Sequence, residues 1–300
     1  MLDQRGEDLG VSSVATLRGR TWVGSCVLGL LLATGCGGSS DDAGASRTPS
    51  PSGTSTSAEA RSPGLSLVAI GDSIPYNSAD DCPGCTGFVD RYADAVAEAT
   101  GETVETTNLS EHTGLTLPEL MAELDDFEGE LSAADVIVIG IAHNSIAMNA
   151  EKPCGATFDE STYQLSDWSL VDGDCATTSA AESRPLFDEL FTKVVAWRSG
   201  KPTIIRTINK YNDWIGWQPA NLTPGQQRRT TLQHDVWNDM LCEVAEAHDV
   251  KCADIYHAFN GPDGSTASTD LLAGDHTHPS EKGNEVIAGV LVDEGFAPLT

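Results

Sequence analysis

The chain has 300 residues, of which 45 are Asp or Glu and 17 are Lys or Arg, so its formal net charge at pH 7 is −28. A surface this acidic repels phosphate backbones and anionic lipid headgroups, which argues against nucleic acid as a partner. Solubility or adaptation to salt explains the acidity better than a specific cation-binding role.

The first segment, residues 1–36, has the pattern of an export signal. Arg18 and Arg20 precede an apolar run, Trp22 to Leu32, that is too short for a comfortable membrane span. Small residues then lead to Cys36, and this pattern resembles a bacterial lipobox, in which Cys36 would be acylated and become the mature N-terminus. The alternative is a plain secretory signal with an incidental cysteine. We therefore expect an exported protein that is either lipid-anchored through Cys36 at the outer face of the cytoplasmic membrane or secreted.

Residues 37–64 consist almost entirely of small and polar residues. Such a composition cannot nucleate a core, so it predicts a disordered tether. The rest, residues 65–300, is long enough for one α/β domain with a single core.

Apolar runs of strand length alternate with segments of helical spacing in this domain. The expected strands are Leu65 to Ile70, Val104 to Leu109, Val136 to Ile141, Thr203 to Ile208 and Val250 to Ile255. The expected helices are Phe88 to Thr100, one that opens at Thr116-Leu117-Pro118-Glu119, Leu186 to Trp197, Leu232 to His248, and Ser280 to Asp293. This alternation predicts a three-layer α/β/α domain with a central parallel sheet of about five strands. The fifth strand would deliver the chain into the loop that carries Asp275 and His278.

Ser73 follows the first expected strand, in the sequence Gly71-Asp72-Ser73. A serine at the carboxyl end of a buried parallel strand is held rigidly and faces the crevice where such sheets bind ligands. The alternative is an ordinary turn in which Asp72 or Ser73 caps the next helix.

A loop near the C-terminus contains an acid and a base within Gly274-Asp275-His276-Thr277-His278-Pro279. A serine nucleophile needs an imidazole as general base, and the imidazole needs a partner that fixes its tautomer and orientation. Asp275 and His278 can fill both roles. The early Gly-Asp-Ser together with the late Asp-x-x-His-Pro resembles the SGNH, or GDSL, hydrolase family of serine esterases and lipases, in which one loop donates both the Asp and the His.

The resemblance also implies an oxyanion hole made by the backbone N–H of Ser73, a glycine and an asparagine. Gly114 lies after the second expected strand, and the lack of a side chain would let its N–H approach the reacting carbonyl. Asn144 lies after the third, where the family usually shows Gly-x-Asn-Asp; Ala142 and Ser145 depart from that pattern. The alternatives are an ordinary loop glycine and an ordinary turn residue.

The resemblance implies an SGNH-type, flavodoxin-like fold and a carboxylic ester hydrolase that works through an acyl-enzyme on Ser73, without a cofactor. The substrate would be a lipid ester or an acylated carbohydrate, since the family includes lipases, phospholipases, thioesterases and carbohydrate deacetylases. We expect a monomer. Two other functions remain open: a metal-dependent hydrolase that uses the loop from Asp275 to His278, and a non-catalytic surface-binding lipoprotein. Asp275, His276 and His278 supply only three ligands, so we expect no metal.

Eight cysteines are present, and two of them, Cys26 and Cys36, lie in the export signal. An even number of remaining cysteines in an exported domain indicates disulfides. The sequence does not fix which of the 15 possible connectivities applies. We expect nearest neighbours to pair, as Cys82–Cys85, Cys154–Cys175 and Cys242–Cys252. A redox-active Cys82-Pro83-Gly84-Cys85 is the alternative for the first pair.

Two histidines and three tryptophans have open roles. His112 and His143 flank the oxyanion candidates and either line the pocket or sit in loops. The long segments after the third and fourth strands contain Trp168, Trp214 and Trp217. These three residues either form a wall for the substrate or anchor the long segments.

Overall fold

The computed structural model describes residues 64–145, 154–159, 162, 164–217 and 220–300. The expected export signal, Cys36 and nearly all of the expected tether lie outside the described residues. No helix in the described ranges is long and apolar enough to cross a membrane.

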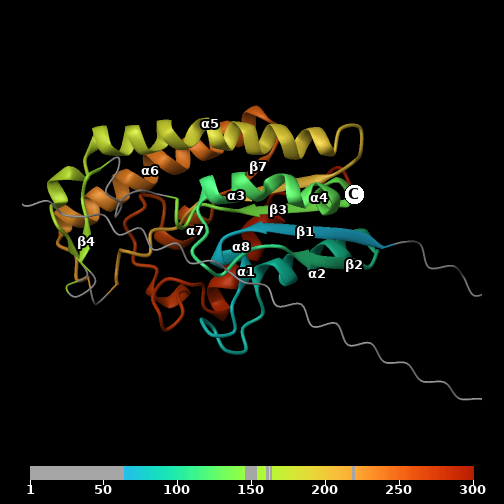
Figure 1. Cartoon of the computed structure of the whole chain (residues 1–300). Helices are drawn as coiled ribbons and strands as arrows, with labels where there is room; N and C mark the ends of the chain where they lie inside the picture. Colours follow the sequence, from blue (N-terminus) through green and yellow to red (C-terminus); the bar gives the residue numbers. More distant parts are fainter. Residues whose placement is uncertain (1–63, 146–153, 160–161, 163, 218–219) are drawn as a thin grey trace, which may run out of the picture. The chain divides into compact units, whose positions relative to one another are not determined.

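The described part of the domain is built on a parallel sheet (Figure 1). Its strands, in the order β2-β1-β3-β6-β7, are β1 (Leu65–Gly71), β2 (Val104–Asn108), β3 (Val136–Gly140), β6 (Ile204–Ile208) and β7 (Lys251–Ala253). The order reverses at β1, where the chain runs first to β2 and then back to β3. Ligands bind open α/β sheets at such a reversal, outside the carboxyl ends of the strands.

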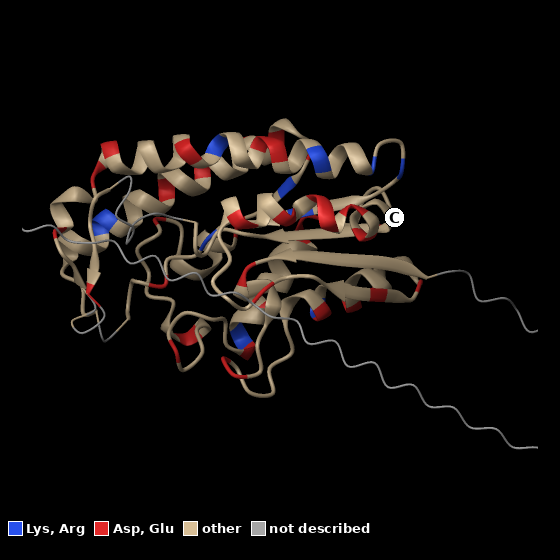
Figure 2. Ribbon diagram, viewed as in Figure 1, with Lys and Arg blue, Asp and Glu red and all other residues tan. Residues whose placement is uncertain are grey.

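Helices cover both faces of the sheet, which confirms the expected three-layer α/β/α class. The side chains of Val68 and Ile70 in β1 pack in one core cluster, and those of Leu67 and Ala69 pack in the other, as the two-residue period of a strand requires. The first core is shared with α3 (Leu117–Glu123), η1 (Leu124–Phe127), α4 (Glu128–Ala133), α5 (Gly173–Trp197) and α6 (Pro224–Ala247). The second is shared with α2 (Phe88–Thr100), α7 (Ile255–Asn260) and α8 (Glu281–Asp293). Acidic residues are distributed over helices of both layers (Figure 2).

Short elements complete the described chain. They are α1 (Ser73–Tyr76), the antiparallel pair β4 (Phe158–Asp159) and β5 (Gln164–Leu165), η3 (Trp168–Leu170) and η4 (Thr269–Leu271).

Two helices begin earlier than expected. The spacing predicted a helix from Leu186, but α5 begins at Gly173, and Pro185 lies inside it. A proline normally interrupts a helix because it lacks an N–H and its ring clashes with the preceding turn, so this stretch did not read as helical. The spacing predicted another from Leu232, but α6 begins at Pro224 in a capping box. Its first turns are polar and carry little apolar periodicity.

The fifth strand does not lead directly to the loop with Asp275 and His278. β7 ends at Ala253, and α7 follows, capped by the Asp254 side chain, which accepts a hydrogen bond from the His257 N–H. The expectation of a direct connection was wrong, because the short segment Val250 to Ile255 contains all of β7 and the first residue of α7.

The three tryptophans form a packed group. Trp214 is buried and makes edge-on contacts with Trp168 and Trp217, each with ring centroids 5.8 Å apart. The Trp168 Nε1–H donates a hydrogen bond to Gln164. This packing supports the interpretation that the tryptophans anchor the long segments.

The six domain cysteines form the three disulfides expected from nearest neighbours. The Cα–Cα distances are 5.5 Å for Cys82–Cys85, 4.9 Å for Cys154–Cys175 and 5.2 Å for Cys242–Cys252, all within the usual range for a disulfide.

We predict that the mature domain contains no free thiol. Each disulfide would add about 2–4 kcal/mol to the free energy of unfolding. Titration of the denatured, unreduced domain should give no reactive thiol, and the same titration after reduction is the control. Two or more reactive thiols in the unreduced sample would contradict the prediction and restore the redox interpretation of Cys82 and Cys85.

Candidate active site

Gly71 allows β1 to end in a sharp turn against β3. Its φ is +151°, and a Cβ at this position would collide with the carbonyl oxygen of Gly140. The Asp72 N–H donates a hydrogen bond to that same carbonyl at 2.9 Å. The turn is therefore held on the neighbouring strand, and Ser73 begins α1 at the carboxyl edge of the sheet.

Asp72 is completely buried and takes the capping role. Its Oδ1 accepts a hydrogen bond from the Ile74 N–H at 3.0 Å, and its Oδ2 accepts one from the His143 N–H at 2.9 Å. Burial raises the pKa of Asp72, although His143, Lys210 and the two backbone donors act in the opposite direction. Because Asp72 caps the helix, the Ser73 hydroxyl is available for another partner.

That partner is His278. The His278 Nε2 lies 2.9 Å from Ser73 Oγ, and its Nδ1 lies 2.5 Å from Asp275 Oδ2. The backbone N–H groups of Thr277 and His278 donate to Asp275 Oδ1 at 3.0 and 3.1 Å. An ionised carboxylate at Nδ1 keeps a proton there, which leaves the Nε2 lone pair to accept the serine proton.

The charges of this chain of groups suit proton transfer. Burial raises the pKa of Asp275, but hydrogen bonds from the His278 side chain and from two backbone N–H groups outweigh it, so the net pKa is lowered and the carboxylate stays ionised. Burial lowers the pKa of His278, but the hydrogen bond and charge of Asp275, together with the charges of Asp81 and Asp72, raise it overall. His278 can therefore hold a proton taken from Ser73.

Contacts from inside and outside the loop hold the backbone at Thr277 and His278. The Ala273 N–H donates to the His278 carbonyl at 2.7 Å, and the Tyr211 hydroxyl donates to the Thr277 carbonyl at 2.6 Å. Burial is the largest cause that raises the pKa of Tyr211 well above its ordinary value, and the charges of nearby carboxylates add to it. The Tyr211 hydroxyl therefore stays neutral and can donate. His276 has a positive φ of 63° at the tip of the turn.

The two oxyanion candidates lie on neighbouring loops. The Asn144 side-chain amide donates a hydrogen bond to the Leu115 carbonyl at 3.2 Å, next to Gly114, which has a φ of +81°. An amide nitrogen carries two protons, so one remains for another acceptor. Ser145, one of the departures from the family pattern, accepts a hydrogen bond from the Leu117 N–H at 2.9 Å. It therefore joins the loop after β3 to the start of α3.

Comparison with known proteins is decisive for the family. The model of the GDSL-like lipase/acylhydrolase family matches residues 69–286 of the chain. The chain belongs to this family. It is therefore an enzyme of the lipase and esterase class, and residues 73, 275 and 278 all lie within the match.

Solved structures show the same fold. A lipase from a goat rumen metagenome superposes with a TM-score of 0.61 at 20% identity, over 79% of this chain and 100% of that chain. Phospholipase A1 from Streptomyces albidoflavus superposes with a TM-score of 0.55 at 18% identity, over 78% of this chain and 100% of that chain. A search of curated protein sequences gave no match. At these identities the likeness concerns the fold.

A buried ionic cluster supports the loop after β3 in this GDSL-family domain, and the sequence did not reveal it. Lys210 Nζ lies 3.1 Å from Asp213 Oδ1 and 3.4 Å from His143 Nδ1, while His143 Nε2 lies 3.5 Å from Asp213 Oδ2. Burial raises the pKa of Asp213, but the charges of Lys210 and His143 hold it well below its usual value. The His143 ring therefore anchors the loop after β3 to Lys210 and Asp213. The backbone N–H of His143, which donates to Asp72, joins the same loop to the turn that carries Ser73.

A second carboxylate, that of Asp81, also lies beside the general base. Its Oδ2 is 3.5 Å from His278 Nε2 and 2.8 Å from His112 Nε2. Asp81 immediately precedes the disulfide Cys82–Cys85. The sequence did not identify this residue, and the only available signal was its place beside a tight disulfide loop just after Ser73.

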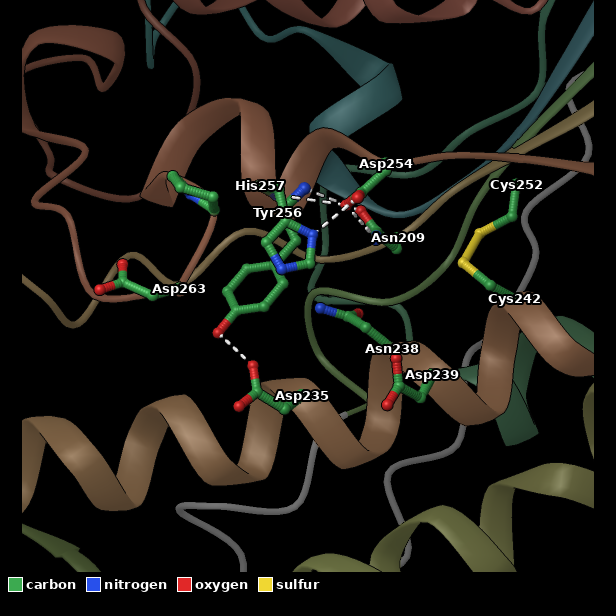
Figure 3. Close-up of a pocket in the computed structure, with 11 residues that line it drawn as sticks. Asn209, Asp235, Asn238, Asp239, Cys242, Cys252, Asp254, Tyr256, His257 and Asp263 are labelled. Atoms are coloured by element: carbon green, nitrogen blue, oxygen red, sulfur yellow. Dashed lines mark hydrogen bonds and ion pairs between the residues drawn. A yellow bond between two sulfur atoms is a disulfide. The ribbon is translucent and has the colours of Figure 1, made fainter.

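A second Asp-x-x-His pair in this GDSL-family domain shows how much the position of the serine matters. His257 Nδ1 lies 2.6 Å from Asp254 Oδ2 in a hollow between α6 and α7 (Figure 3). The hollow is about 500 Å³ in volume, and the residues that line it in the described structure include no serine. The same spacing and the same Nδ1 contact thus occur without a nucleophile, so the 2.9 Å contact with Ser73 is what distinguishes His278.

Proposed function

We propose that this protein is an exported serine esterase that hydrolyses carboxylic esters through an acyl-enzyme on Ser73. The observation that carries the proposal is the unbroken series of hydrogen bonds from Asp275 through His278 to Ser73, with distances of 2.5 and 2.9 Å. It acts as a monomer, without a cofactor and without nucleic acid. Its substrate is a lipid ester or an acylated carbohydrate.

The reaction proceeds in two halves. His278 Nε2 takes the Ser73 proton as Oγ attacks the ester carbonyl, and Asp275 stabilises the imidazolium. The negative oxygen accepts hydrogen bonds from the N–H groups of Ser73 and Gly114 and from the Asn144 side chain. The intermediate collapses when the C–O bond to the alcohol breaks and His278 protonates the alcohol. Water, deprotonated by His278, then attacks the acyl carbonyl, and the acid leaves as Ser73 regains its proton.

A panel of esters with acyl chains from acetyl upward, together with acetylated sugars, tests the activity and divides lipid esters from acylated carbohydrates. We expect hydrolysis and covalent labelling by a fluorophosphonate probe, because both need an activated serine. Labelling should disappear in Ser73→Ala and persist in Ser265→Ala, a change at an exposed serine that is not part of the proposed catalytic group. A wild-type protein that is not labelled would favour the non-catalytic lipoprotein. A rate abolished by a chelator would favour the metal-dependent hydrolase.

We also propose lipid anchoring at Cys36, supported by the residues from Arg18 to Cys36 and the tether composition. Cys36→Ala is expected to release the protein from the membrane fraction of expressing cells, since the acylated residue is removed. Cys26→Ala, a matched change within the same segment, should leave the protein in that fraction. Partition of Cys36→Ala wholly with the membrane would contradict the lipoprotein assignment.

A further inference from the structure

Three side chains from separate segments converge in front of the nucleophile. Asp81, His112 and His278 each present one ligand atom, and these atoms all lie within 4.8 Å of one another. In the described part of the chain they form the one group of three or more His, Cys, Asp and Glu side chains with this spacing. Two imidazole nitrogens and a carboxylate oxygen are a ligand set typical of zinc.

Two of the three separations between the ligand atoms can be compared with those around a tetrahedral ion. Two ligands that each lie about 2.1 Å from a tetrahedrally coordinated zinc are about 3.4 Å apart. Asp81 Oδ2 is 3.5 Å from His278 Nε2 and 2.8 Å from His112 Nε2. The shorter of these two separations would have to open, and the ligand atoms of the two histidines, which lie no more than 4.8 Å apart, would have to take up the same spacing. The His112 side chain, which is 40% exposed, has room to make both adjustments.

The hydrogen bonds of His278 already select the ring tautomer that a metal requires. Asp275 binds the Nδ1–H, so the lone pair is on Nε2. A carboxylate on the distal nitrogen is the common outer partner of a metal-bound histidine, where it fixes the ring and raises its basicity. The arrangement that makes His278 a base for Ser73 therefore also makes it a ligand.

The surroundings favour a cation. The disulfide Cys82–Cys85 closes the segment that holds Asp81 beside the two histidines. The exposed face of His112 opens the group to solvent, and the formal net charge of −28 raises the local concentration of cations.

We propose that Asp81, His112 and His278 form an inhibitory site for a divalent transition-metal ion such as zinc. The bound ion takes the Nε2 lone pair of His278, so Ser73 loses the acceptor for its proton and the enzyme stops. Ion binding itself is independent of the reaction, whereas the inhibition rests on the proposed function of Ser73 and His278.

Binding is tested with Co²⁺, whose visible absorption reports tetrahedral histidine coordination, on the full domain carrying Ser73→Ala. We expect one tightly bound ion per chain, and loss of the absorption when His112→Ala is added. Asp81→Asn is a second variant that conserves side-chain shape. Absence of tetrahedral absorption, or an unchanged spectrum in both variants, would overturn the site. Because this protein cannot turn over through Ser73, the result stands even if the esterase proposal fails.

Inhibition is tested with Zn²⁺ on the active protein, with each variant compared with its own rate in a chelator. We expect Zn²⁺ to stop the wild-type enzyme and the chelator to restore it. The half-inhibiting concentration should rise by about 10-fold or more in His112→Ala and in Asp81→Asn. His257→Ala removes the histidine of the other Asp-x-x-His pair (Figure 3) and should leave that concentration unchanged. Equal sensitivity of the wild type, His112→Ala and Asp81→Asn would show that the ion acts elsewhere and would overturn the proposal.

Discussion

Replacement of His278 by Ala is expected to lower kcat by about 10³-fold or more, because water cannot replace a positioned general base next to the serine. His278 Nε2 lies 2.9 Å from Ser73 Oγ, so the variant loses both the proton acceptor in the attack and the proton donor to the departing alcohol. Steady-state rates on the best ester of the panel, measured in the presence of a chelator, give the comparison.

His276 is the matched control, two residues away on the same loop. Its φ is 63°, a region that asparagine tolerates better than alanine, so His276→Asn removes the imidazole with little backbone strain. We expect a far smaller loss of kcat than in His278→Ala. Equal losses in the two variants would mean that both rings are needed, and the assignment of His278 as the sole base would be wrong.

The sheet was predictable because its strands are short and mostly buried. All five residues of β3, Val136–Gly140, are buried, and a strand covered on both faces reads as one apolar run. The edge strand β2 is largely exposed and gave a weaker signal. The first half of α5 was not predictable, because Pro185 contradicts the local rule and tertiary packing outweighs it. The start of α7 was hidden for a different reason, since an apolar segment of six residues suits a strand or a helix equally.

The residues of the candidate site also fall into those that the sequence revealed and those that only the folded structure shows. Ser73, Asp275 and His278 were found because each lies in a short motif whose spacing carries the chemistry. Asp81 and Lys210 were missed because their contacts, with His278 and with His143, join residues far apart in the sequence and depend on the folded sheet. A motif alone can also suggest a site that is not there. The Asp254-x-x-His257 pair has the same local geometry as Asp275 and His278, but the residues that line its hollow in the described structure include no serine.

The two carboxylates beside His278 should have different effects on the rate. Asp275 binds Nδ1, so Asp275→Asn would place an amide there and favour the tautomer whose Nε2 already carries the proton. We expect a loss of kcat smaller than that of His278→Ala but far larger than that of His276→Asn; the same change costs about 10⁴-fold in a serine protease with this arrangement. Asp81 lies 3.5 Å from His278 Nε2 but does not bind Nδ1, so it does not set the tautomer of the ring. Asp81→Asn should therefore leave the rate at high pH within about tenfold of the wild type.

The pH dependence of the rate distinguishes an effect of the Asp81 charge on the pKa of His278 from a direct part in proton transfer. Only the neutral His278 ring accepts a proton, so kcat/KM should rise with pH through the pKa of His278, which lies above its ordinary value. The charge of Asp81 contributes to that rise in pKa, and the neutral Asn would remove it. The acidic limb of Asp81→Asn should therefore move to lower pH, while its plateau stays near that of the wild type. Profiles of kcat/KM from about pH 5 to about pH 9, recorded with a chelator present, test this. An acidic limb that stays in place or moves to higher pH would show that the Asp81 charge does not act on His278, and a plateau as low as that of Asp275→Asn would make Asp81 part of the proton-transfer chain.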